Sequence, residues 1–162
     1  MKKTHDKQTH VLIAEEAIKV ADAIYKTRKA LDHVEDTERE EQAAKQALNQ
    51  ARREALYHHE KVWEAFSREH DAKANEDQKM ENTAREIRKS QSEDHGEARE
   101  ATARAEQRYW KAHHERLKAE ADLKRAEQAE ALATQKYLEA TAHIRAEEEA
   151  QRQREEQEAQ EN

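Results

Sequence analysis

The stretch that decides the fold is EAREATARAEQRYWKAHHERLKAEADLKRAEQAEALATQKYLEATAHI, residues 97–144. It lacks proline and glycine and is dominated by Ala, Glu, Lys, Arg and Gln, which are good helix formers. Its apolar residues recur at steps of three and four, so they follow one side of a long helix. This predicted seam is Ala98, Ala101, Ala105, Tyr109, Ala112, Ala119, Leu123, Ala126, Ala133, Tyr137, Ala140 and Ile144. A second stripe with Trp110, Leu117 and Leu138 favours contact with more than one neighbour.

The composition of the whole chain is typical of long helices. Ala, Glu, Lys, Arg and Leu make up 97 of the 162 residues, with one glycine, no proline and no cysteine. Sheets, barrels and nucleotide-binding folds are close to excluded, because their tight turns need Gly or Pro. Only 18 residues are Leu, Ile, Val or Phe, too few to fill a wide core. We therefore expect an all-α fold, either an elongated antiparallel coiled-coil hairpin or a thin three-helix bundle.

A first long helix is predicted from about residue 9 to about residue 70, with its own a/d seam. The N-terminal part of this seam is the most apolar segment of the chain, and the second arm offers little apolar cover opposite it. Uncovered apolar stripes usually mark an interface. We therefore expect contact with a protein partner or a second copy at Ile13, Ala17, Val20, Ile24, Leu31 and Val34. A capping box at Thr37–Glu40 leaves open a break that folds this segment back as a third helix.

The predicted organisation is a flexible N-terminus (residues 1–10), a helical hairpin or bundle (residues 11–150) and a polar acidic tail (residues 151–162). The chain should reverse in a tip or turn region at about residues 70–97, where Asn, Asp, Ser and the lone glycine concentrate. Within that region, Ser90–Glu97 carries the best turn signal, and the second helix would follow from about Glu97.

Two pairings of the arms are compatible with the sequence. Facing residues of a hairpin have position numbers that add to a constant. A sum near 171 matches bulky residues of the two arms, for example Leu48 with Leu123 and Trp63 with Trp110. A sum near 191 turns the chain at Gly96 and leaves the N-terminal seam beyond the second helix. We favour the first pairing, because stranding the most apolar segment is costly.

The histidines invite a metal hypothesis that the sequence does not support further. His58-His59-Glu60 and His113-His114-Glu115 repeat one tripeptide and would face each other in the 171 pairing. The chain contains no H-E-x-x-H motif, so we expect no metal site and no cofactor. Solvated side chains beside the seam are the default interpretation, and a pH-sensitive interface is favoured over metal binding. There is no cysteine, and the three serines lie in polar surroundings. We therefore expect neither an enzyme nor a small-molecule substrate.

Charge and hydropathy restrict the partners. The 30 basic residues are interspersed among 37 acidic ones, so no basic stripe points to nucleic acid. The run Val11–Ala14 is far too short to span a membrane, and we expect no membrane insertion. The lack of cysteine gives no sign of an oxidising compartment, so a cytoplasmic protein is predicted.

Two features resemble a known family. Gln135-Lys136-Tyr137-Leu138-Glu139 leads into an acidic, Gln-rich tail, and an Ala- and Arg-rich stretch in residues 47–69 precedes Val62-Trp63. In these and in its two arms the chain resembles the central-stalk coiled-coil proteins of type III secretion and flagellar export systems. The resemblance implies a cytosolic stalk or adaptor that engages an export ATPase. A receptor-binding or inhibitory helical protein, similar to bacteriocin hairpins or coded by a phage or plasmid, is the alternative.

Overall fold

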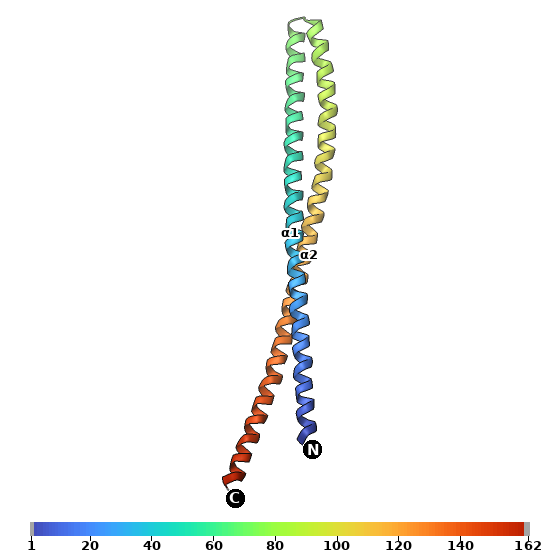
Figure 1. The fold of residues 1–162 in the computed structure, drawn as a ribbon. Helices are drawn as coiled ribbons and strands as arrows, with labels where there is room; N and C mark the ends of the chain where they lie inside the picture. Colours follow the sequence, from blue (N-terminus) through green and yellow to red (C-terminus); the bar gives the residue numbers. More distant parts are fainter. Residues whose placement is uncertain (1, 161–162) are drawn as a thin grey trace. The chain divides into compact units, whose positions relative to one another are not determined.

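The computed structural model describes the backbone of residues 2–160 and the side chains of residues 11–157. It contains two helices, α1 (Lys2–Ala74) and α2 (Gln78–Gln160), which pack against each other as a hairpin (Figure 1). The structure is 98% helical, and the described residues include no strand. The predicted all-α hairpin is confirmed. The three-helix alternative is wrong, because α1 runs without a break through Thr37.

The chain divides into two compact units. The turn unit is Asp36–Leu117, which contains the end of α1, the turn and the start of α2. The terminal unit is Met1–Glu35 together with Lys118–Asn162. Each unit therefore holds one segment of each helix. The predicted flexible N-terminus, residues 1–10, lies outside the residues whose side chains are described, although α1 begins at Lys2.

The chain reverses over Asn75, Glu76 and Asp77. Glu76 takes a left-handed conformation with φ of 57°. The amides of Glu76 and Asp77 donate to the carbonyls of Lys73 (3.2 Å) and Ala72 (2.9 Å), which is the Schellman pattern that ends many helices. Asp77 then caps α2, because its Oδ1 accepts from the Met80 amide at 3.0 Å. Two adjoining caps thus build the turn without glycine.

The reversal lies within the predicted segment of residues 70–97, but its position and extent correct the prediction. Ser90–Glu97 is part of α2, which begins at Gln78 and not near Glu97. Gly96 has no left-handed conformation, so it serves as an ordinary helical residue. The helix also continues through the predicted tail as far as Gln160.

The covered side chains of α1 alternate at steps of three and four along the helix. They are Ile13, Glu16, Val20, Ala23, Thr27, Ala30, Val34, Thr37, Glu41, Ala44, Leu48, Ala51, Ala55, His58, Val62, Ala65, Glu69 and Ala72, and Lys61 beside Val62 is partly covered as well. This mean spacing of 3.5 keeps one stripe of a helix facing a neighbouring helix. Most of the predicted seam is confirmed, including Ile13, Val20 and Val34. At Ala17, Ile24 and Leu31 the covered residue is instead the preceding one.

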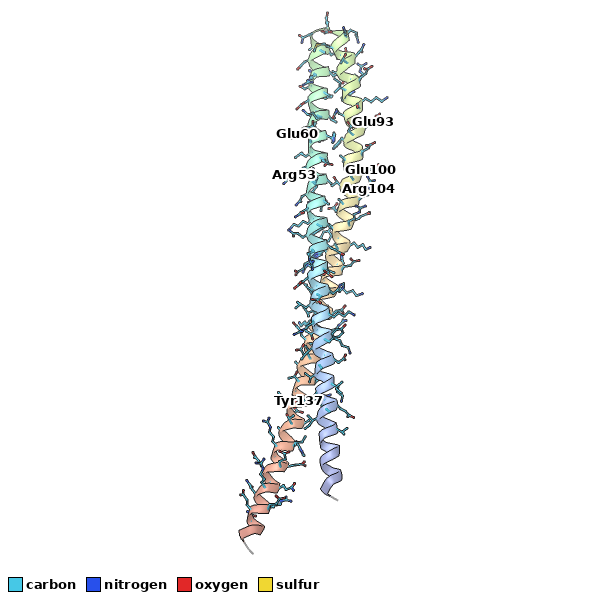
Figure 2. The ribbon with its side chains drawn as sticks, in the orientation of Figure 1. Arg53, Glu60, Glu93, Glu100, Arg104 and Tyr137 are labelled. Carbon is cyan, nitrogen blue, oxygen red and sulfur yellow. The ribbon has the colours of Figure 1, made fainter. Side chains whose placement is uncertain are left out.

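The covered seam positions of α2 follow the same rule. They are Glu81, Ala84, Arg88, Gln91, His95, Ala98, Thr102, Ala105, Tyr109, Ala112, Arg116, Ala119, Leu123, Ala126, Glu130, Ala133, Tyr137, Ala140 and Ile144. Other residues of α2 are partly covered as well, among them Ala101, so every residue of the predicted seam is at least partly covered. The outer faces of the turn unit carry charges. Figure 2 shows Arg53 and Glu60 of α1, and Glu93, Glu100 and Arg104 of α2, pointing away from the opposite helix.

Contacts between the helices fix their register. The Thr102 hydroxyl donates to the Ala51 carbonyl at 3.2 Å, and the rings of His59 and His95 lie 5.2 Å apart. In the turn unit, position numbers of residues in contact across the seam add to between 153 and 158. Both predicted pairings, near 171 and near 191, are therefore wrong. The reversal at Asn75–Asp77 sets this register.

The reason for the error is that bulky residues of one helix lie at the level of alanines of the other. In the observed register Leu48 lies at the level of Ala105, and Tyr109 at the level of Ala44. A large side chain beside a methyl group lets the backbones stay close while the layer remains filled. The predicted pairing of bulky with bulky residues, such as Leu48 with Leu123, does not occur.

Candidate functional site

The six predicted interface residues fall on two different sides of α1. Ile13 and Val20 are partly covered and Val34 is 7% exposed, so these three lie in the seam with α2. Ala17, Ile24 and Leu31 are exposed, Ile24 to 38% and Leu31 to 46%. Because residues seven apart share a side of a helix in such a seam, these last three form one stripe beside it.

A shallow groove of the terminal unit runs next to this stripe. It is lined by Thr27 of α1 and by six residues of α2: Glu127, Glu130, Ala131, Thr134, Gln135 and Leu138. Thr27 belongs to the seam and lies three residues after Ile24 and four before Leu31, so the stripe borders the groove on its α1 side. We call the stripe and groove together the groove face. Its members used below are Ala17, Ile24, Arg28 and Leu31 of α1, and Glu127, Glu130, Ala131 and Leu138 of α2.

The sequence had indicated only part of this face. Leu138 was placed in a second apolar stripe of the second arm, and Leu138 is indeed 59% exposed. Ala131, Thr134 and the two glutamates were not identified. Ala131 lies seven residues before Leu138 and fourteen after Leu117, so a search at steps of seven would have found it.

The terminal unit leaves many of its large apolar residues exposed, although the seam covers others, such as Val34, Leu123 and Tyr137. Its buried apolar residues are Ala23, Val34 and Ala119. Its exposed large apolar residues are Val11, Leu12, Ile18, Ile24, Tyr25, Leu31, Leu132 and Leu138. A surface with this much uncovered apolar area is typical of proteins that bind other proteins.

The turn unit contains an ionic cluster around Glu41. Its carboxylate pairs with His113 Nδ1 at 2.8 Å and with the Arg116 guanidinium. The hydrogen bond from His113, followed by the bond and charge of Arg116, holds the Glu41 pKa below its ordinary value. Burial acts in the opposite direction but is outweighed. The cluster places complementary charges of the two helices at one level.

A second cluster lies nearer the turn. Glu69 pairs with Arg85 Nε at 3.2 Å and with Arg88 Nε at 2.9 Å. Arg88 also lies over the Phe66 ring at 5.9 Å, a favourable cation–π geometry. Like the first cluster, it joins α1 to α2 by contacts with specific partners, which helps to fix one register.

Between the two clusters lies a layer of three histidines: His58, His59 and His95. The Trp63 indole donates to His59 Nε2 at 3.1 Å, and His58 Nδ1 is buried without a hydrogen-bond partner. The His95 pKa is held below its ordinary value, first by burial and then by the charges of His59, Arg99 and His58. His95 therefore resists protonation in the folded chain.

The predicted meeting of the two His-His-Glu tripeptides is wrong. His58 and His59 lie in the layer with His95, and His113 pairs with Glu41. Among the described residues, no group of three or more His, Cys, Asp or Glu side chains is arranged to hold a metal ion. The same part of the chain contains no helix that is long and apolar enough to cross a membrane.

Comparison with known proteins adds no relative. Neither the family models, nor the curated proteins, nor the solved structures include a match to this chain.

Proposed function

We propose that this protein is a non-enzymatic helical stalk or adaptor, an antiparallel coiled coil that acts through contacts with other protein chains in the cytoplasm. The observation that carries the proposal is the groove face, where Ile24, Leu31 and Leu138 are exposed while alanines fill much of the seam. Such a chain presents its large apolar side chains to something outside itself.

The spacing of the covered residues supports the coiled-coil part of the proposal. A strict alternation of three and four residues on both helices is the pattern that two supercoiled helices need. The resemblance to central-stalk proteins of type III secretion and flagellar export systems suggests an export ATPase as the partner. A stalk needs a long helical hairpin with protein-binding surfaces and no catalytic centre.

The test is capture of partners by the full chain and by a groove-face variant. Ile24→Asp with Leu31→Asp should abolish the specific capture of proteins from cells that express the chain naturally, as identified by mass spectrometry. Leu132→Asp is the matched control, since Leu132 is exposed to 54% and lies outside the groove face. Identical sets of captured proteins for both variants would contradict the proposal.

A second candidate function is a receptor-binding or inhibitory protein that masks its target. It is favoured by exposed residues of the turn unit: Trp63 (60%), Phe66 (45%) and Met80 (59%). Trp63 and Phe66 form a T-shaped pair at 5.8 Å, and aromatic residues dominate many binding surfaces. Loss of target binding in Trp63→Ala, with binding intact in Ile24→Asp, would favour this function over the stalk.

A further inference from the structure

On the groove face, a large apolar residue of one helix lies at the same level as an alanine of the other helix. The groove itself sets which residues share a level, because Thr27 lines it together with Glu127, Glu130 and Ala131. Ile24 of α1 and Ala131 of α2 have position numbers that add to 155, so they share a level. Ala17 and Leu138 also add to 155. At one level the large residue is on α1, and at the other it is on α2.

The charges of the same face follow the same register. Arg28 lies between Ile24 and Leu31 on the stripe, and Arg28 and Glu127 again add to 155. Among the described residues, Arg28, Glu127 and Glu130 form no ion pair within the chain. The groove face therefore combines large apolar side chains beside alanines with unpaired charges, a cation on α1 and two carboxylates on α2.

We infer that the groove face binds a second copy of this chain, around a twofold axis parallel to the helices. This rotation places α1 of one copy against α2 of the other at the same level. Ile24 then enters the space above Ala131 of the second copy, and Leu138 enters the space above Ala17. Arg28 meets Glu127 and Glu130 of the second copy, and the axis repeats every contact.

The packing and the charges agree on this one arrangement. Large residues lie on alanines between the copies, which is the same rule that fills the seam within each chain. A twofold interface must be self-complementary, and a face with both its cation and its carboxylates unpaired meets that condition. The product in the terminal unit is a four-helix bundle. This inference deepens the proposed function, because it identifies an occupant of its contact surface.

Charge exchange between two variants tests the inference. Sedimentation of the full chain over a range of concentrations should show a dimer. Arg28→Glu alone, and Glu127→Arg with Glu130→Arg alone, should each raise the dimer dissociation constant by about tenfold or more, because like charges then meet. An equimolar mixture of the two variants should restore the dimer as a heterodimer. Lys29→Glu makes the same change of charge one residue away and should leave the dimer unchanged.

Cross-linking tests the geometry, and the chain contains no cysteine that would interfere. Ile24→Cys mixed with Ala131→Cys should form a disulfide-linked heterodimer on mild oxidation. Ile24→Cys mixed with Leu132→Cys should not. Each cysteine resides in a separate chain, so a bridge within one hairpin cannot produce the result.

Three results would overturn the inference: a chain that stays monomeric at high concentration, a dimer that Arg28→Glu leaves intact, or a mixture of charge variants that does not associate. A monomer that still captures another protein through Ile24 and Leu31 would overturn this inference and leave the proposed function standing. Identical sets of captured proteins for the Ile24→Asp with Leu31→Asp variant and for the Leu132→Asp control, with a dimer of the full chain that responds to charge exchange as expected, would do the reverse.

Discussion

Gly96 is a glycine in the interior of a helix that has no need of one. It is exposed in α2, its φ is not positive, and a Cβ built on it would meet no atom within 4 Å. Glycine inside a helix is less favourable than alanine by about 0.5–1 kcal/mol. Gly96→Ala should therefore raise the free energy of unfolding by about that amount, as measured by urea denaturation. A loss of stability would mean that the chain turns at Gly96 after all.

Glu76 is the opposite case, because glycine would adopt its backbone conformation more easily than glutamate does. Its φ of 57° is left-handed, and a left-handed conformation costs an L-residue about 1–2 kcal/mol. Glu76→Gly should stabilise the protein by about 1 kcal/mol in the same assay. Glu86→Gly, at an exposed position inside α2, is the control and should destabilise by about 1 kcal/mol. Destabilisation by both changes would contradict the Schellman turn.

At the scale of the helices, burial in the seam decides how much a leucine contributes to the free energy of unfolding. Leu48 is 4% exposed and Leu132 is 54% exposed. Leu48→Ala should cost about 2–3 kcal/mol of unfolding free energy, toward the lower end for buried leucines because one helix alone covers it. Leu132→Ala should change the unfolding free energy by less than about 0.5 kcal/mol. Equal losses in urea denaturation would show that Leu132 faces a neighbour in the folded chain.

The histidine layer predicts a pH response of the helix pair in the turn unit. The folded-state pKa of His95 lies below its ordinary value of 6.5. Below about pH 6.5 the unfolded chain therefore binds a proton that the folded chain resists. The free energy of unfolding should therefore be highest above about pH 6.5. It should fall as the pH drops from there through the folded-state pKa of His95. The nearby charges of His59, Arg99 and His58 also lower the pKa of His95.

Urea denaturation between pH 7.5 and pH 5.5 measures this response. His95→Gln should reduce the loss of stability across this range, since an uncharged side chain then occupies the layer. His70→Gln is the control, because His70 is exposed on α1. The Glu41 pKa, which is lowered by His113 and Arg116, removes stability only in the more acidic range of carboxylates. An unchanged pH dependence in His95→Gln would show that His95 does not cause the response.

At the scale of the molecule, the second arm could be predicted from its sequence almost residue by residue. From Ala98 to Ile144 the seam residues recur at steps of three, four or seven, a more continuous pattern than the second stripe with Trp110, Leu117 and Leu138. Over residues 13–34 of the first arm, every second position of the predicted seam was displaced by one residue. Ile24 and Leu31 are more apolar than their neighbours Ala23 and Ala30, yet the alanines are turned toward α2. Hydropathy alone places the larger residue inside.

The register could not be predicted, because two assumptions about packing and turns were wrong. Bulky residues were expected to face each other, but a seam rich in alanine is filled by setting each large residue on a small one. A turn was expected where Gly96 and the serines lie, but Asn75–Asp77 joins two helix caps without glycine. The residues Ala17, Ile24, Leu31 and Leu138 were predicted as apolar stripes, but their meeting along one groove follows from the register and could not be predicted.

Truncation from the C-terminus tests how stability is distributed along the terminal unit. The last residue of the regular α2 seam is Ile144, and the described side chains from Gln151 to Gln157 are exposed. Removing residues 151–162 should therefore change the unfolding free energy by less than about 0.5 kcal/mol. Removing residues 136–162 also deletes Tyr137, Ala140 and Ile144. Figure 2 shows Tyr137 on the α2 segment of this unit.

In the observed register Ile13 of α1 lies at the level of Ala140, so the longer truncation uncovers the start of α1. An isolated helix end without packing frays, and the helix content lost should exceed the 27 deleted residues when measured by circular dichroism at 222 nm. The shorter truncation should lose only the signal of its own residues. Equal losses per deleted residue in the two truncations would mean that α1 near Ile13 is held by something other than α2, and a second copy of the chain is the first explanation to examine by sedimentation.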